Sequence, residues 1–369
     1  MNIFFSKLLE EFQNVIESPF LIWEMLTMLR IGIKGESALE LDEFLKSNAP
    51  EIEITENDIE HLRTRYMLSE GAKTNSHRNQ RILKIANRIF INNGTRLKES
   101  FVEALQQRFA CGVQEVDFSA RQKAAATINT WVSDATNGRI PTLISSHDVG
   151  VNTQAVLTNA IYFKAKWQHQ FETIDTRQET FHINSGEDVI VPMMGQTMNV
   201  RYAYIPSHNV MAIDLPYRDT DLSMLVIMPI EEPSSSRSLA AVSQLKLSVV
   251  LDHMVFRKVF LKLPKFSYNC NINVHSLLTQ FGVHGIFQAS HDFDNLIADH
   301  ASNFSVSKII QEAYINVTEE GTEAAAATAC CIDGSMHFDE TFIANRPFYF
   351  CIKNRNLLKL FDGCYRRPC

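Results

Sequence analysis

The sequence predicts a single domain of the mixed α+β class. Apolar residues recur at helical spacing through much of the first 150 residues, whereas short apolar or alternating runs bounded by turn residues dominate after Asn152. No linker or change in composition separates the two halves. With 369 residues, of which 45% are hydrophobic, the chain can bury a sizeable core.

Amphipathic helices are predicted in the N-terminal half. Ser37, followed three residues later by Glu40, forms a capping box that predicts the start of a helix. Residues 101–109 and 124–132 show the same periodicity, and 45–81 is polar enough for a loop and short helices. At the start of the chain, the apolar residues that would share one helix face are Phe5, Leu8, Leu9, Phe12, Val15 and Ile16.

Strands are predicted from short runs of apolar or alternating residues. Four of these runs cover 157–163, 188–194, 222–229 and 259–266. Two more, at 314–317 and 343–352, flank a segment of small residues.

Charge and cysteine usage exclude several classes of function. The net charge is −7 and the 35 Lys and Arg residues form no basic stripe, so we expect no nucleic-acid partner. Seven cysteines without a Cys-x-x-Cys pair indicate reduced thiols. Lys7, Glu10 and Glu11 interrupt any signal core, and no run of 18 uncharged apolar residues occurs. We therefore expect a cytoplasmic protein without a membrane partner.

Catalytic motifs are lacking. There is no His-Glu-x-x-His zinc motif, no Gly-x-Ser-x-Gly elbow and no glycine-rich phosphate loop, and the twelve histidines are scattered. Cys330 and Cys331 are adjacent, and neighbours in an extended chain point to opposite sides, which favours structural roles. We expect no catalytic residues, no metal and no cofactor, and hence not an enzyme.

The unusual feature is the segment of small residues between the last two strand runs. Residues 319–329 read EEGTEAAAATA, which could be an alanine-rich helix. However, about two dozen residues with few large apolar groups are too many for an ordinary connection in a compact domain. In an extended chain Thr322, Ala324, Ala326 and Thr328 alternate on one face and could slide over a filled core.

This segment resembles the hinge of the serpins, and similarity extends over nearly the whole chain. Ser18-Pro19 looks like the start of the family's second helix, and INTWV at 128–132 like its helix across the sheet. The most specific match is TNAIYFKAKW at 158–167. Further ordered matches are VPMM at 191–194, LPY at 215–217, LPKF at 263–266 and RPF at 346–348.

The resemblance implies a serpin fold over residues 1–369, with a large central sheet, smaller sheets and an exposed reactive loop at about 319–342. It implies a monomeric suicide inhibitor whose partner is a target protease, held as a covalent acyl complex. The hinge residues would be Glu319, Glu320, Gly321, Thr322, Glu323, Ala324, Ala325, Ala326, Ala327 and Thr328. The residues implied to act where the sheet opens are Ser18, Asn159, Trp167, Lys265 and Gln311, and Glu319 is placed to meet Lys265.

Three positions depart from the family pattern. Leu21 stands where the family usually has a second serine, and Gln311 where it usually has a histidine. The Gln311 amide can still donate and accept hydrogen bonds, whereas Leu21 cannot. We expect a retuned barrier to sheet opening. Asp362 replaces a usually apolar residue, for which the sequence offers no account.

The scissile bond has two candidate positions. Family spacing from Gly321 gives Ser335-Met336, whereas counting back from Pro347 with the spacing of poxvirus serpins gives Asp333-Gly334. An aspartate would suit a protease with a basic pocket, such as a caspase or granzyme B. The short start before Ser18 also resembles the leaderless poxvirus serpins of the cytokine response modifier A type. A leaderless cellular serpin of the ovalbumin type remains the alternative, as does a serpin-fold protein that binds a partner without trapping a protease.

Overall fold

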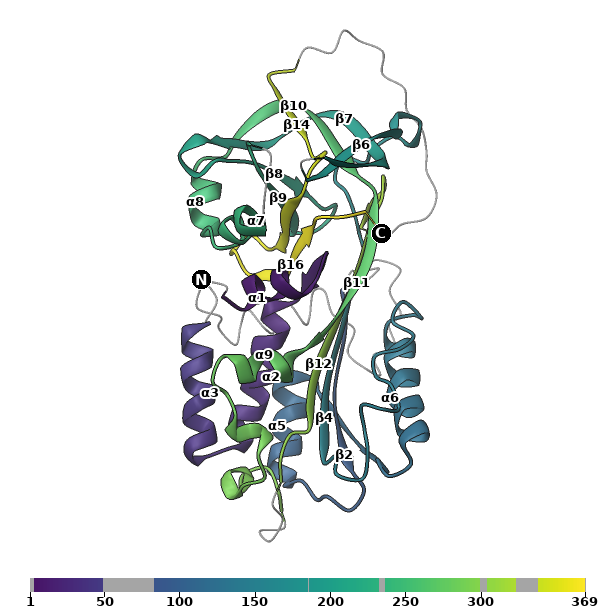
Figure 1. Cartoon of the computed structure of the whole chain (residues 1–369), viewed down its shortest axis with the longest axis vertical. Helices are drawn as coiled ribbons and strands as arrows, with labels where there is room; N and C mark the ends of the chain where they lie inside the picture. Colours follow the sequence, from purple (N-terminus) through teal and green to yellow (C-terminus); the bar gives the residue numbers. More distant parts are fainter. Residues whose placement is uncertain are drawn as a thin grey trace.

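A computed structural model describes residues 3–48, 83–184, 186–231, 236–298, 304–322 and 338–368. Within these residues the protein is built from two sheets with helices around them (Figure 1). The mixed α+β class is confirmed, although β2 and β3 already fall in the N-terminal half.

The central sheet has seven strands among the described residues, and β4 and β12 are parallel neighbours in its middle. β2 pairs antiparallel with β4, and β11 pairs antiparallel with β12. In sheet order the strands are β3 (Gly112–Val116), β2 (Leu83–Asn92), β4 (Ala155–Phe163), β12 (Lys308–Val317), β13 (Gly321–Thr322) and β5 (Ala165–Lys166), with β11 (Phe266–Asn273) beside β12.

The second sheet lies at the other end of the molecule and has nine strands among those described (Figure 1). β10 is held between β7 and β14. In sheet order the strands are β1 (Val15–Glu17), β16 (Lys359–Tyr365), β15 (Phe348–Lys353), β9 (Ser223–Pro229), β8 (Val210–Pro216), β7 (Glu187–Ile205), β10 (Val255–Pro264) and β14 (Glu340–Ile343), with β6 (Arg177–Asn184) paired to β7.

Helices cover both faces of the central sheet. α6 lies over one face, and α2, α3, α5 and α9 lie on the other side (Figure 1). The α-helices are α1 (Ile3–Glu11), α2 (Pro19–Gly32), α3 (Gly35–Ser47), α5 (Glu99–Phe109), α6 (Arg121–Ala135), α7 (Ser236–Ser243), α8 (Leu247–Asp252) and α9 (Val274–Gln280). Short 3-10 helices are η1 (Thr173–Asp175), η2 (Pro206–His208), η3 (Gly285–Phe287) and η4 (His291–Phe293).

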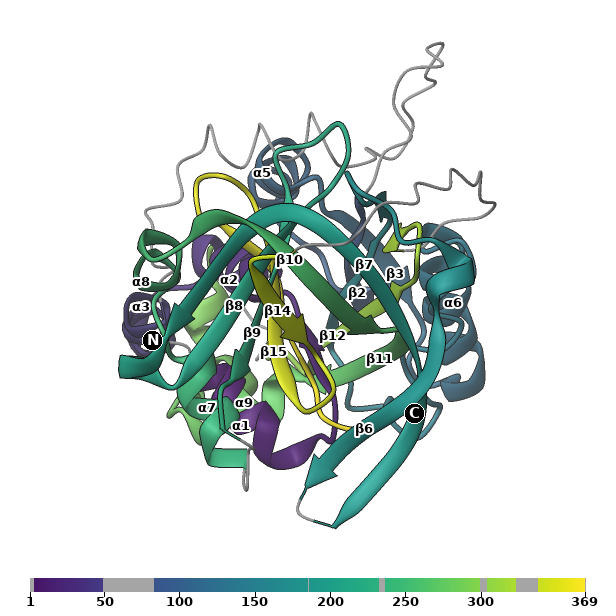
Figure 2. The same ribbon diagram turned by 90° about the horizontal axis from the view of Figure 1, so that it is seen from above.

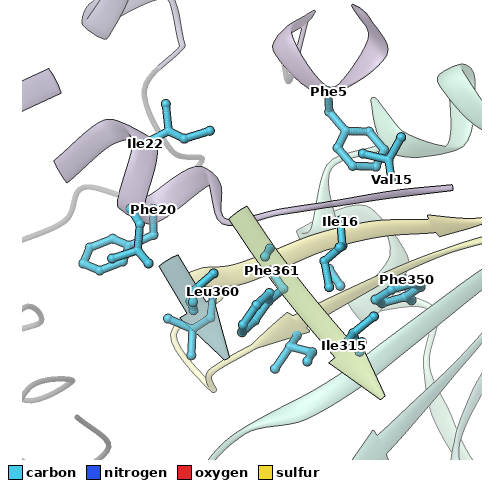
Figure 3. Close-up of a cluster of buried hydrophobic side chains, with 14 of the residues drawn as sticks. Phe5, Val15, Ile16, Phe20, Ile22, Ile315, Phe350, Leu360 and Phe361 are labelled. Atoms are coloured by element: carbon cyan, nitrogen blue, oxygen red, sulfur yellow. The ribbon is translucent and has the colours of Figure 1, made fainter. Parts of the chain in front are cut away.

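The main core joins segments that are far apart in the sequence. Figure 3 shows Phe5 and Phe20 from the N-terminal segment near Ile315 of β12 and Phe350 and Phe361 of the C-terminal strands. A second, smaller core lies under α6, where Ile128 and Val132 pack toward Phe90 and Phe118. Both faces of the central sheet are therefore buried along β4, all nine residues of which are buried.

Several local expectations need correction. Val15 and Ile16 belong to β1, not to the first helix, because they pair with Cys364 and Gly363 of β16. The predicted strand 259–266 breaks at Lys265, where the chain passes from the second sheet to the central sheet. The run 343–352 is likewise two strands, because β14 pairs with β10 and β15 with β9.

The predicted capping box is also wrong. α3 begins at Gly35, so Ser37 lies inside its first turn and its backbone N–H donates to Asp292 Oδ2 at 3.0 Å. The Glu40 carboxylate instead accepts hydrogen bonds from the backbone N–H groups of His284 and Gly285, at 2.8 and 2.7 Å. The Ser37 backbone N–H and the Glu40 side chain therefore join α3 to distant segments, which no local pattern reveals.

Candidate functional site: the sheet seam and the hinge

The site is centred on the contact between β4 and β12, which we call the seam. It consists of seven residue pairs, from Lys308 opposite Val156 to Tyr314 opposite Tyr162. Gln311 lies opposite Asn159 in the middle, and both side chains are fully buried. Any strand added between β4 and β12 has to separate these pairs.

Gln311 joins both strands of the seam to the start of α2. Its Oε1 accepts from the Ser18 backbone N–H at 2.8 Å, and its Nε2 donates to the Ser18 carbonyl oxygen at 3.2 Å. The same Nε2 donates to Asn159 Oδ1 at 2.8 Å. Asn159 in turn donates to Asn87 on β2. The amide thus satisfies buried polar groups of Ser18 and Asn159, and its replacement of the usual histidine leaves the seam closed by hydrogen bonds.

Ser18 and Leu21 lie at the start of α2, beneath the seam. Ser18 is the N-cap residue, and its Oγ accepts from the Leu21 backbone N–H at 3.4 Å. Pro19 at the first helical position suits this start, since its missing N–H has no partner to lose. The Leu21 side chain is fully buried in the main core. Leu21 therefore contributes packing to this region in place of a hydroxyl group.

Beyond the seam, the first hinge residues already form a strand. In β13, Thr322 pairs with Val317 of β12 and with Ala165 of β5, and Gly321 pairs with Lys166. The chain reaches β13 through a tight turn in which Thr318 N–H donates to the Gly321 carbonyl at 2.8 Å. A Cβ on Gly321 would lie 2.1 Å from the Ala165 carbonyl oxygen, so only glycine fits there.

Trp167 and Tyr217 hold this turn from below. Their rings stack with centroids 4.6 Å apart, and both are almost fully buried. Trp167 Nε1 donates to the Thr318 carbonyl at 3.0 Å, and its backbone N–H donates to the Glu320 carbonyl at 2.9 Å. The Tyr217 hydroxyl lies 2.8 Å from the Thr322 hydroxyl. Thr322 therefore points toward the core, with its polar group satisfied.

Glu319, at the base of the hinge, forms the ion pair that the resemblance implied. Lys265 Nζ lies 2.9 Å from Glu319 Oε2, and the Thr176 hydroxyl donates to Oε1 at 2.8 Å. Burial alone would raise the pKa of Glu319, but the hydrogen bonds from Lys265, the backbone and Thr176 outweigh burial and hold that pKa below its ordinary value. The carboxylate is thus ionised at neutral pH.

The sequence-predicted residues separate into two groups. Ser18, Asn159 and Gln311 meet at the seam, while Trp167, Lys265 and the hinge residues 319–322 meet at its end. The other hinge positions, 323–328, and both candidate scissile bonds lie outside the described residues. Within the predicted reactive loop, 319–342, β13 and most of β14 belong to the sheets.

Sequence reasoning missed two residues of the site. Tyr217, in the LPY match, received no role although its hydroxyl reaches Thr322. Thr176 carried no signal, since a lone threonine in a loop is common. In the described ranges, no cluster of three or more His, Cys, Asp or Glu residues could hold a metal ion, and no helix is long and apolar enough to cross a membrane.

A family model described as Serpin (serine protease inhibitor) matches residues 3–368. The chain belongs to the serpin family. Serine protease inhibitor 42Dd of Drosophila melanogaster is 32% identical to this serpin over 356 residues, 95% of this chain and 90% of that protein. Human leukocyte elastase inhibitor is 32% identical over 365 residues, 96% and 93% of the two chains. The crystal structure of Serpin48 from Tenebrio molitor matches with a TM-score of 0.81 at 26% identity, covering 96% of this chain and 92% of that one.

The family corrects one expectation from the sequence. The sequence predicts only that the chain is not an enzyme, which assigns it no activity. The family is described by an activity, the inhibition of serine proteases. The function of this serpin is therefore to be sought in its encounter with a protease.

Proposed function

We propose that this serpin inhibits its target as a suicide substrate. The protease nucleophile attacks the carbonyl carbon of the scissile bond in the reactive loop, about 319–342, and forms an acyl bond while the new amino terminus leaves. The hinge then inserts into the central sheet before water can hydrolyse the acyl bond. The product is a covalent complex of serpin and protease.

The observation that carries this proposal is the position of Gly321 and Thr322. They already pair with β12 and β5 at the end of the seam, with Thr322 on the core face. Extending β13 residue by residue would lead the chain into the seam, where the new strand would replace β4 as the partner of β12 at seven residue pairs. Alternation would place Ala324, Ala326 and Thr328 on the face of Thr322, where small side chains fit over a filled core.

The energetics support a one-way reaction. About ten new strand hydrogen bonds at ~0.5–1.5 kcal/mol each would contribute on the order of 10 kcal/mol. This is comparable with the stability of a whole domain, so the uncut form has to be held by a kinetic barrier. The buried Gln311 contacts across the seam are suited to supply part of that barrier.

The choice of target depends on which bond is cut. Cleavage at Ser335-Met336 fits an elastase-like or chymotrypsin-like protease, and several relatives are named leukocyte elastase inhibitor. Cleavage at Asp333-Gly334 fits a caspase or granzyme B and accords with the resemblance to poxvirus serpins. We propose that the serpin acts as a monomer in the cytoplasm, in line with the free, buried thiols of Cys270, Cys351 and Cys364.

A gel experiment tests the function. The serpin is incubated with caspase-1, granzyme B, an elastase-like and a chymotrypsin-like protease, and complexes that survive boiling in detergent are sought. Sequencing the released C-terminal peptide then identifies the bond. Cleavage by every protease without any stable complex would contradict the proposal.

A pair of arginine substitutions tests the insertion step. In Ala324→Arg a charge would be carried onto the core face of the inserted strand, where burial without a partner is costly. We expect this variant to be cleaved as a substrate with at least tenfold less complex. The matched control Ala325→Arg places the same charge on the opposite face and should keep inhibition. Equal complex formation by both variants would argue against insertion.

A non-inhibitory role is the second candidate. Leu21 and Gln311, which replace the usual serine and histidine, favour it because they alter the groups beneath the seam. In that case the cut loop would stay outside the sheet. The gel and the thermal measurement described in the Discussion separate the two functions.

A further inference from the structure

Glu312 is a buried carboxylate on the seam to which the proposed mechanism assigns no part. It belongs to β12 and is only 2% exposed. Its side chain points to the α6 side of the central sheet, because the alternate residues Ile310 and Tyr314 pack in the smaller core beneath α6. Both views show α6 and α9 on opposite sides of the strands β2 and β12 (Figure 1, Figure 2). Glu312 therefore lies on the face of β12 opposite to that of Gln311.

Two amides of β11 hold the Glu312 carboxylate. Its Oε1 accepts a hydrogen bond from Asn269 Nδ2, and its Oε2 accepts one from Asn271 Nδ2 at 3.0 Å. The same Asn271 Nδ2 donates to the Leu143 carbonyl oxygen at 2.9 Å. Leu143 belongs to the segment 140–154, which connects α6 to β4 and which we call the strap. Glu312 is thus one amide away from the strap.

The strap crosses the seam. It leads into β4 on one side of the seam, whereas its contacts lie on β11 and β12, on the other side. Asp148 Oδ1 of the strap lies 2.6 Å from Lys308 Nζ at the start of β12. The Gln154 backbone N–H donates to Ser307 Oγ at 2.9 Å. A strand that separates β4 from β12 therefore has to release or stretch these contacts, so that the strap lifts.

The described groups around Glu312 supply no counter-ion. β11 contributes neutral amides, β4 places Ala160 opposite Glu312, and the α6 residues buried against the sheet are apolar. Tyr314 and Lys308 are the other ionisable side chains on this face of β12, but Lys308 is about 13 Å away along the strand and is paired with Asp148. Burial accordingly raises the pKa of Glu312 above its ordinary value of 4.5, and the two amides oppose this shift only in part.

The other titratable groups near the seam behave differently. Burial opposes ionisation of Asp148, but hydrogen bonds, first among them the one from Lys308, outweigh burial and lower its pKa to about 2. The Cys270 thiol, on the opposite face of β11, stays protonated because burial raises its pKa to about 12. His275 of α9 lies 3.1 Å, through Nδ1, from the carbonyl oxygen that precedes β12, and burial lowers its pKa below 6.5. A test has to separate Glu312 from His275.

We infer that Glu312 makes the insertion step sensitive to pH, because its charged carboxylate favours lifting of the strap and its neutral acid form keeps the strap closed. Ionisation releases one proton to the solvent and leaves a charge beneath the strap without a counter-ion. Lifting of the strap admits water to this charge, which lowers the barrier to insertion. Acid has the opposite effect and holds the serpin in its uninserted form. This inference rests on the proposed function and adds to it a condition under which insertion is fast.

The test follows insertion of a strand without any protease. A fluorescent peptide with the sequence of residues 322–329 is long enough to span the seven pairs of the seam. Its uptake by the intact serpin is followed by fluorescence anisotropy, and a raised thermal midpoint shows that the bound peptide has inserted. Between about pH 4.5 and pH 7.5 we expect the rate of uptake by the parent to rise at least about fivefold. Glu312→Gln keeps the size of the side chain but cannot ionise, so it should show the parent's acidic rate at every pH.

Two further variants serve as controls. Glu115→Gln is the matched one, because Glu115 is an exposed carboxylate on β3 of the same sheet, and it should keep the pH profile of the parent. Asp148→Asn removes the charge that pairs with Lys308 and should speed uptake at every pH, with the rise toward neutral pH retained. An unchanged rate for Asp148→Asn would show that the strap does not limit insertion and would overturn the inference.

The remaining outcomes separate the inference from the proposed function. A rise that is as steep for Glu312→Gln as for the parent would assign the pH dependence to His275 or to the peptide and overturn the inference. Uptake by the parent at a rate independent of pH would also overturn it, while the proposed function would stand. If the parent takes up no peptide at any pH and cleavage of its loop does not raise its thermal midpoint, insertion itself fails and both proposals fall.

Discussion

The seam and the hinge end of the central sheet are neighbours along β12 but are held together differently. At the seam, β4 and β12 pair directly, and Gln311 ties both to α2 through fully buried hydrogen bonds. At the hinge end the two strands no longer pair, and β13 fills the space between β12 and β5. On the proposed mechanism, insertion would extend β13 from this end and would have to separate the pairs of the seam.

Cleavage of the loop should produce the largest effect, because on the proposed mechanism only the uncut loop prevents the hinge from entering the seam. A nick between residues 329 and 338 should add a strand worth on the order of 10 kcal/mol and raise the thermal midpoint by about 10–15 °C. Calorimetry of cut and intact protein measures the shift. Cut Ala324→Arg should gain much less, and equal melting of cut and intact parent would favour the non-inhibitory reading.

The second-largest effect is expected from removing the Gln311 amide at the centre of the seam. Gln311→Ala leaves the Ser18 N–H and Asn159 Oδ1 buried without their partner, which we expect to lower the free energy of unfolding by about 2–4 kcal/mol. Urea unfolding provides the measurement. Gln311→His, which restores the residue usual in the family, should recover most of the loss. A loss below about 1 kcal/mol for Gln311→Ala would mean that this network does not hold the seam.

A smaller effect is expected at the hinge end. Tyr217→Phe keeps the stacking on Trp167 but removes the hydroxyl that meets Thr322, for a loss of about 1 kcal/mol in the free energy of unfolding. Tyr202→Phe, the same change at another buried tyrosine, is the control. The contrast with Gln311→Ala would be broken if the hinge-end variant lost as much stability as the seam variant.

The smallest effect is expected for the ion pair of Glu319 with Lys265, whose contribution to stability depends on pH. The pKa of Glu319 is lowered in the folded state, so its pair with Lys265 stabilises the fold above its ordinary value of 4.5 and is lost as pH falls through the lowered pKa. Glu319→Gln should therefore cost about 1 kcal/mol at pH 6, and the difference from the parent should disappear at still lower pH. A difference that persisted unchanged at pH 3 would exclude the ion pair as its cause.

Glu312 on the seam should respond in the opposite direction. Burial raises the pKa of Glu312 despite hydrogen bonds from Asn269 and Asn271. A raised pKa means that stability is lost as pH rises from the ordinary value of 4.5 through the raised one. Glu312→Gln should remove that loss, and unfolding measured between pH 4 and pH 7 tests it. A parallel profile for variant and parent would show that Glu312 does not titrate there.

The predictable parts of the fold are those whose signal is local. Helices α5 and α6 and strands β4 and β9 follow from periodicity and lie within a few residues of their predicted ranges. Pairing with residues that are distant in the sequence overrides the local pattern elsewhere. Val15 and Ile16 have helical spacing but pair as a strand with β16, and Glu40 meets the N–H groups of residues 284 and 285 instead of a cap.

Asp362 illustrates the same division. The sequence offered no reason for a carboxylate among buried residues of the C-terminal strands. In the structure, Asp362 accepts a hydrogen bond from the Tyr349 hydroxyl and pairs with Lys359, 3.3 Å away. A buried carboxylate is tolerated when it is paired and hydrogen-bonded, and these partners lie on β15 and β16, which only the second sheet brings together.

The sequence by itself determined the family and the types of residue beneath the sheet, because these depend on side-chain size and on ordered motifs along the chain. Only the tertiary structure decided that Gln311 joins Ser18 to Asn159, that Tyr217 holds Thr322, and that the hinge already begins a strand. Hydrogen bonds between residues more than 100 positions apart depend on how sheets and helices pack. No pattern along the chain encodes that distance.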